Sequence, residues 1–161
     1  MQIYLLRHGI AEDARSGQAD AGRALTAEGK EKLRRVLRRA GAAGVRPASI
    51  VSSPLRRALE TAAVAAEALG YSGKVVESRA LLPEASPYDL WEEIRRRVEE
   101  PAILLASHEP LMSAMAAFLL GSPALQLDMK KAAIVRIDCD RLAREPKGVL
   151  KWMLTPAVAG E

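Results

Sequence analysis

The chain has 161 residues, of which 49% are hydrophobic and 27% are charged, and its formal net charge is +4. These values are typical of one globular domain, so we expect a single domain over residues 1–161. They exclude a disordered chain, a collagen-like chain and a disulfide scaffold. The only cysteine, Cys139, excludes an internal disulfide bond and a cysteine-based zinc cluster.

Arginines cluster at Arg34-Arg35, Arg38-Arg39 and Arg95-Arg96-Arg97. We interpret these clusters as solvated helix faces, because no aromatic residues interleave with them to stack nucleic-acid bases. The sequence therefore predicts no nucleic-acid partner. The longest apolar runs fall short of the ~20 residues that span a bilayer, and no basic segment precedes the first of them. We expect a cytoplasmic protein without a membrane association.

Strand-like and helix-like patterns alternate along the chain. Short apolar runs predict strands, in chain order, at Ile3–Leu6, Ile50-Val51, Val75-Val76, Ala102–Ala106, Ala133–Ile137 and Val149–Leu154. Apolar residues at helical spacing predict helices between them, from Thr26 to Ala42, from Ser53-Pro54 to Leu69, from Tyr88 to Val98, and from Pro110 to Leu120. Thr26 and Ser53 are expected to be N-caps.

This alternation predicts an α/β fold, a three-layer α/β/α sandwich with helices on both faces of a mostly parallel sheet. The last two strands are joined by the turn-rich segment Asp138 to Gly148, which is too short for a full crossover. We therefore expect these two strands to be antiparallel to each other, which makes the sheet mixed.

Three predicted strands end in polar residues. The first ends in Arg7-His8, the second in Ser52-Ser53 ahead of Arg56-Arg57, and a later one in Ser107-His108. Open α/β sheets bind ligands beyond the carboxyl ends of their strands. If the three junctions adjoin, they form a pocket of two imidazoles, at least two guanidiniums and two helix N-termini.

Such a pocket suits a phosphoryl group. Guanidinium groups match its oxygens bidentately, and helix N-termini offer free N–H groups. A neutral imidazole is a competent nucleophile toward phosphorus. Neighbouring arginines are expected to lower the pKa of His8, which would leave its ring unprotonated at neutral pH.

The same residues resemble the motifs of the histidine phosphatase (phosphoglycerate-mutase-like) superfamily. Leu6–Gly9 is similar to its first motif, Ser53–Ala58 with Thr61-Ala62 to its second, and Ser107-His108 to its third. Arg23–Thr26 with Gly29 also matches a family segment. Within the superfamily the chain resembles the small SixA-type phosphohistidine phosphatases, and the resemblance spans nearly the whole sequence.

The resemblance implies a role for each matching residue. His8 would be the nucleophile that becomes a phosphohistidine intermediate. Arg7, Arg57 and His108 would bind the phosphoryl group and stabilise its transition state. Arg23 is a candidate for the rim of the pocket. Glu84 is a candidate proton donor, with a loop carboxylate at a helix start as the alternative.

The implied function is a metal-independent phosphohistidine phosphatase without a cofactor. Its partner would be a phosphohistidine-containing protein, a component of a phosphorelay or phosphotransferase system. Two alternatives stay open on sequence alone. One is a phosphatase of small phosphoesters or other phosphoramidates, and the other is a module that binds phosphorylated partners without hydrolysing them.

Overall fold

A computed structural model of the chain describes residues 1–160 and contains a six-stranded sheet with the strand order β3-β2-β4-β1-β5-β6. The strands are β1 (Gln2–Arg7), β2 (Ser49–Ser52), β3 (Val76–Glu77), β4 (Ala102–Ser107), β5 (Ile134–Asp138) and β6 (Val149–Leu154). The first four are mutually parallel, β5 is antiparallel to β1, and β6 is antiparallel to β5. The expected mixed sheet, with its closing antiparallel pair, is confirmed.

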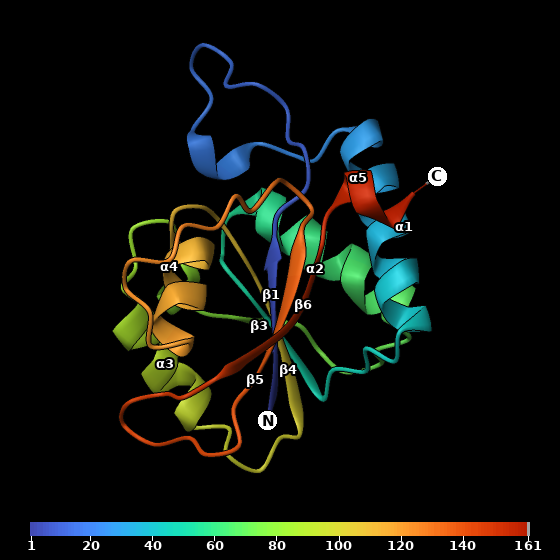
Figure 1. Cartoon of the computed structure of the whole chain (residues 1–161). Helices are drawn as coiled ribbons and strands as arrows, with labels where there is room; N and C mark the ends of the chain where they lie inside the picture. The colour runs from blue at the N-terminus through green and yellow to red at the C-terminus, as the bar shows by residue number, and fades with distance from the viewer. Residues whose placement is uncertain (161) are drawn as a thin grey trace.

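Helices cover both faces of this sheet, which gives the three expected layers (Figure 1). The helices are α1 (Ala27–Ala42), α2 (Arg56–Leu69), α3 (Pro87–Arg95), α4 (Leu111–Leu119) and the short α5 (Pro156–Ala159). Two short 3-10 helices, η1 (Asp20–Gly22) and η2 (Arg79–Leu81), lie in the connections. α1 packs against α2, and α3 packs against α4.

Side-chain alternation along β1 divides the core between the two faces. Ile3 and Leu5 point toward α3 and α4, whereas Tyr4 and Leu6 point toward α1 and α2. All four side chains are fully buried. Successive side chains of a strand point to opposite faces, so a strand buried on both faces has a continuous apolar run. This explains why Ile3–Leu6 contains no charged residue.

The start of α2 differs from the prediction. The sequence predicts a helix that opens at Ser53-Pro54 with Ser53 as N-cap, but α2 begins at Arg56 and its N-cap, Leu55, has no side-chain cap bond. The physical reason is that Ser53 continues the ladder of β2, since its N–H donates to the Ala106 carbonyl at 3.0 Å. Thr26, by contrast, caps α1 as expected and accepts from the Gly29 N–H.

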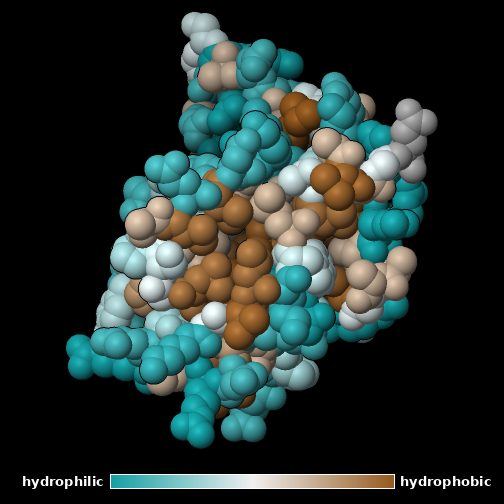
Figure 2. Space-filling view, in the orientation of Figure 1, coloured by the Kyte–Doolittle hydropathy of each residue, from teal (hydrophilic) through white to brown (hydrophobic). Residues whose placement is uncertain are grey.

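β6 forms one edge of the sheet and carries exposed hydrophobic residues. Figure 2 shows hydrophobic side chains gathered over the middle of the face on which β6 lies in Figure 1. Val149 and Leu150 are 59% and 45% exposed. Across residues 1–160, no helix has the length and apolar character that crossing a membrane requires.

Candidate functional site

Strand register places the three polar junctions next to one another. Arg7, the last residue of β1, pairs with Ser107, the last residue of β4. His8 and His108 therefore follow from adjacent strands, and the His8 N–H donates to the Ser107 carbonyl at 2.9 Å. β2 lies on the other side of β4 and delivers Ser53 beside the same edge. The two imidazole centroids are 5.2 Å apart, so the expected convergence of both rings is present.

His8 is buried, and one nitrogen of its ring is engaged by the backbone. Its side chain is 7% exposed, and its Nδ1 lies 2.7 Å from the Gly9 carbonyl oxygen. A carbonyl oxygen only accepts hydrogen bonds, so Nδ1 carries the proton and the lone pair is on Nε2. Burial lowers the pKa of His8 to about 4. The Gly9 hydrogen bond opposes this shift, and the nearby charges of Arg57, Arg7 and Lys131 add to it. The sequence attributed the shift to the arginines alone, whereas burial is the larger cause.

His108 is also buried, with 1% of its surface exposed. Its Nε2 lies 2.7 Å from the Ser53 hydroxyl, which can donate this bond and thereby leave the proton of the ring on Nδ1. Burial, followed by the neighbouring His8 and Arg57, lowers the pKa of His108 to about 3. A neutral ring with an Nδ1–H group can donate a hydrogen bond to a phosphoryl oxygen.

Arg7 and Arg57 bring two guanidiniums to the rings. Arg7 Nη1 donates to the Met129 carbonyl at 2.7 Å, and Arg57 is only 5% exposed. Within residues 1–160, Arg7 Nε, Arg57 Nε and His108 Nδ1 are buried without a hydrogen-bond partner. Buried polar groups without partners are costly, and an oxyanion supplies acceptors of the kind that these groups lack.

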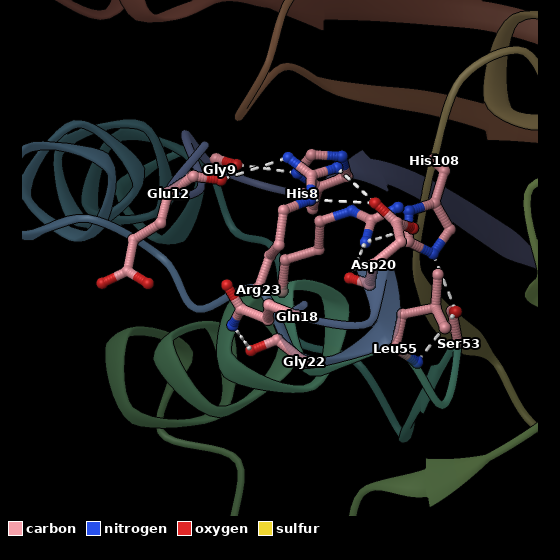
Figure 3. Close-up of polar contacts among 11 residues, drawn as sticks. His8, Gly9, Glu12, Gln18, Asp20, Gly22, Arg23, Ser53, Leu55 and His108 are labelled. Carbon is pink, nitrogen blue, oxygen red and sulfur yellow. Dashed lines mark hydrogen bonds and ion pairs between the residues drawn. The ribbon is translucent and has the colours of Figure 1, made fainter. Parts of the chain in front are cut away.

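Asp20 is a member of the site that the sequence analysis missed. Its carboxylate lies 3.2 Å from Arg57 Nη1 and 2.9 Å from Arg23 Nη2, and Figure 3 shows it between the two imidazoles in that view. Burial acts to raise the pKa of Asp20, but the hydrogen bond from Arg23 and the charge of Arg57 outweigh it and lower that pKa. Asp20 is therefore ionised at neutral pH. The spacing of Asp20 and Arg23, three residues apart, was the available sequence signal.

The two remaining candidates lie in different surroundings. Arg23 is at the edge of the site, where it bonds to Asp20 and, through Nη1, to the Glu12 carbonyl at 3.2 Å. Glu84 lies between η2 and α3 and is exposed. Among residues 1–160, Glu84 forms no hydrogen bond or ion pair with the residues of the site. Its role as proton donor stays a prediction.

Thr61 is a second residue whose contribution the sequence left unassigned. Its hydroxyl accepts from the Gly9 N–H at 3.1 Å and donates to the Arg57 carbonyl at 2.7 Å. Thr61 therefore ties the residue after His8 to the turn of α2 that carries Arg57. The signal in the sequence was the four-residue spacing from Arg57, which places both residues on one face of a helix.

Known proteins with this fold and these motifs define the class to which the chain belongs. The model of the histidine phosphatase superfamily (branch 1) matches residues 3–86. An uncharacterized protein of Picosynechococcus sp. is 31% identical over 137 residues, which cover 84% of this chain and 83% of the relative. The chain therefore belongs to the histidine phosphatase superfamily.

Solved structures confirm the fold. The structure of the protein histidine phosphatase SixA complexed with tungstate has a TM-score of 0.85 and 22% identity, and the match covers 98% of each chain. A mycobacterial glucosyl-3-phosphoglycerate phosphatase has a TM-score of 0.70 and 20% identity, with 93% of this chain and 96% of that one covered. The similarity in fold to SixA therefore extends over nearly the whole chain.

Proposed function

We propose that this protein hydrolyses phosphohistidine in a partner protein through a covalent phospho-His8 intermediate, without a metal or another cofactor. The observation that carries the proposal is the state of the ionisable groups in the site. His8 is neutral with its Nε2 lone pair free, and the Asp20 carboxylate is ionised in a pair with Arg57. The site thus supplies a nucleophile and cations but no protonated carboxylic acid at Asp20.

In the first step, His8 Nε2 attacks the phosphorus atom. A P–N bond to His8 forms while the P–N bond of the substrate breaks, and its electron pair stays on the leaving imidazole. Charge spreads over the three equatorial oxygens in such a transition state. The guanidiniums of Arg7 and Arg57 and the Nδ1–H group of His108 bind these oxygens, and electrostatic stabilisation is the main effect.

In the second step, water attacks the phosphorus of phospho-His8 and releases inorganic phosphate. The P–N bond returns its electron pair to Nε2, and one proton of the water goes to the released phosphate or to solvent. His8 leaves as a neutral imidazole, because its Nδ1 keeps the proton that it donates to the Gly9 carbonyl. The ring is then in the tautomer that starts the next cycle.

The ionised Asp20 favours a substrate whose leaving group needs no proton from the enzyme. An alkoxide leaving from a phosphoester is a poor leaving group and benefits from a general acid. The imidazole of phosphohistidine can already carry a proton on its other ring nitrogen and then departs neutral. This difference supports a phosphoramidate substrate, with a phosphorelay or phosphotransferase protein in the cytoplasm as its source.

A rapid-quench experiment with a radiolabelled phosphohistidine protein tests the proposal. We expect label to appear transiently on His8 as an acid-labile, base-stable adduct, and His8→Ala to abolish phosphate release. A phosphoserine peptide, assayed in parallel, should be turned over much more slowly.

Two other results would contradict the proposal. Comparable turnover of the phosphoserine peptide would favour a phosphatase of small phosphoesters. Binding that survives in His8→Ala, together with no phosphate release by the unmodified protein, would favour a binding module.

A further inference from the structure

A basic groove begins at the site and continues away from it between α1, α5 and the segment that precedes β5. It consists of two hollows of about 450 Å³ and about 390 Å³ that share Lys32, Lys130 and Pro156. Arg7 lines the first hollow and Arg35 the second. In Figure 1, α5 and the start of α1 lie together at the upper right, beside the segment that leads into β5. We call this feature the basic groove.

Positively charged side chains outnumber the carboxylates that pair with them in the basic groove. Its five cationic side chains are Arg7, Lys32, Arg35, Lys130 and Lys131. Glu28 pairs with Lys32 at 2.6 Å, and Asp128 pairs with Lys130 at 2.9 Å. Within residues 1–160, Arg35 and Lys131 form no ion pair. Positive charge is therefore in excess.

The two ion pairs can be exchanged for contacts with a partner. The side chains of Glu28 and Asp128 are 66% and 77% exposed. Solvent-exposed ion pairs contribute little to stability. An incoming carboxylate can therefore replace either of them at small cost.

Backbone hydrogen bonds join the basic groove to the catalytic residues. The Ala132 N–H donates to the His8 carbonyl at 3.1 Å, and the Arg7 N–H donates to the Ala133 carbonyl at 3.0 Å. Lys130 and Lys131 immediately precede these residues. A protein that presents a phosphohistidine to His8 has part of its surface within reach of this groove.

We infer that the basic groove binds acidic side chains on the protein that carries the phosphohistidine, and that it selects protein substrates with an acidic surface around that residue. This inference rests on the proposed function. The uncharged lining of the groove is Ile10, Ala132, Thr155, Pro156 and Ala157, with no aromatic ring for base stacking. An acidic protein surface therefore fits the groove better than a nucleic acid does. Complementary charge accelerates association, most strongly at low salt.

Two synthetic peptides test the inference. Both contain one chemically phosphorylated histidine, flanked in one peptide by glutamates and in the other by glutamines. We expect kcat/KM at low salt to be roughly tenfold higher for the glutamate peptide, in the range of electrostatic steering, and the preference to shrink as salt is added. The small molecule phosphoramidate serves as a substrate that does not reach along the groove.

The variant Arg35→Glu/Lys130→Glu should remove the preference for the glutamate peptide. The matched control Arg38→Glu/Arg96→Glu makes the same change in charge at side chains that are 63% and 75% exposed and lie outside the groove, so it should keep the preference. If the double variant does not fold, Lys130→Glu alone can be used instead, because Lys130 is exposed. Its expected effect is a smaller loss of the same preference.

Equal kcat/KM for the two peptides, with phosphoramidate and both peptides hydrolysed, would overturn the inference and leave the proposed function standing. Phosphate release from neither peptide would overturn the proposed function. In that case, fluorescence anisotropy with the unphosphorylated glutamate peptide tests whether the basic groove binds acidic side chains. Equal binding of this peptide to the unmodified protein and to the double variant would contradict the inference. Tighter binding of a single-stranded oligonucleotide than of the glutamate peptide would assign the groove to nucleic acid instead.

Discussion

At the scale of single residues, the site depends on a competition for Arg57. The Arg57 guanidinium that would hold a phosphoryl oxygen is paired with the Asp20 carboxylate at 3.2 Å. Asp20 is 61% exposed and bonds to Arg23 as well, so it can move aside while it stays paired with Arg23. A phosphoryl group and the Asp20 carboxylate are both anions and repel each other. Asp20 therefore opposes the binding of any oxyanion at Arg57.

Asp20→Asn should strengthen the binding of an oxyanion. The substitution keeps the shape of the side chain and removes its negative charge. We expect the Kd for tungstate, measured by calorimetry, to fall roughly two- to fivefold, the range set by an exposed ion pair of about 0.4–1 kcal/mol. Asp13→Asn removes one charge from an exposed residue of the same loop and should leave the Kd unchanged. Weaker tungstate binding by Asp20→Asn would show that Asp20 holds Arg57 in place instead of competing for it.

At the scale of elements, the site depends on how α1 and α2 attach to the end of β1. Gly29 of α1 lies against the backbone of Ile10, and a Cβ at Gly29 would overlap the Ile10 carbonyl. Thr61 of α2 holds the N–H of Gly9. These two contacts position Gly9 and Ile10, the residues that immediately follow His8.

Thr61→Val should destabilise the protein and slow its reaction. Valine has a similar shape but no hydroxyl, so the Gly9 N–H loses its buried acceptor. An unsatisfied buried donor costs about 1–3 kcal/mol, and urea denaturation measures this loss. Hydrolysis of phosphoramidate should slow as well, because the backbone beside His8 is no longer held. Thr61→Ser restores the hydroxyl and should recover most of both properties, whereas equal stability of Thr61→Val and Thr61→Ser would contradict this role.

At the scale of the whole molecule, folding keeps both histidines of the chain neutral. Burial is the main cause of the lowered pKa of each, to about 4 for His8 and about 3 for His108. An unfolded histidine has a pKa near 6.5. Below pH 6.5 the unfolded chain therefore binds protons that the folded chain does not bind. Stability must fall as the pH decreases from 6.5 toward 4.

The free energy of unfolding should be lower at pH 5 than at pH 7 by about 2 kcal/mol for each histidine. Urea denaturation at the two pH values measures the difference. Asparagine does not titrate, so His8→Asn should remove the contribution of His8, which is about half of the combined difference from the two histidines. Proton NMR gives an independent test, because the chain has only two histidines. A ring that titrates with a midpoint near pH 6.5 in the folded protein would contradict the prediction.

The strands and helices were predictable where the pattern of apolar residues continues over several neighbouring positions. Ile3–Leu6 and Ala102–Ala106 are continuous apolar runs, and both are buried strands of the sheet. The start of α2 was not predictable from its serine and proline, because the hydrogen bond of Ser53 to β4 competes with a helix cap. The short elements η1, η2 and α5 lack a hydrophobic period of their own.

The sequence by itself determined the layered fold and the chemistry of the strand ends, because apolar periodicity and the residues that follow a strand are local properties of the chain. It identified His8, Arg7, Arg57 and His108 as partners through motifs spread over about a hundred residues. Only the tertiary structure decided that Asp20 pairs with Arg57, that Thr61 holds Gly9, and that Lys32, Arg35 and Lys130 line one groove. Each of these contacts joins segments that are distant in the chain, and strand register together with helix packing sets their distances.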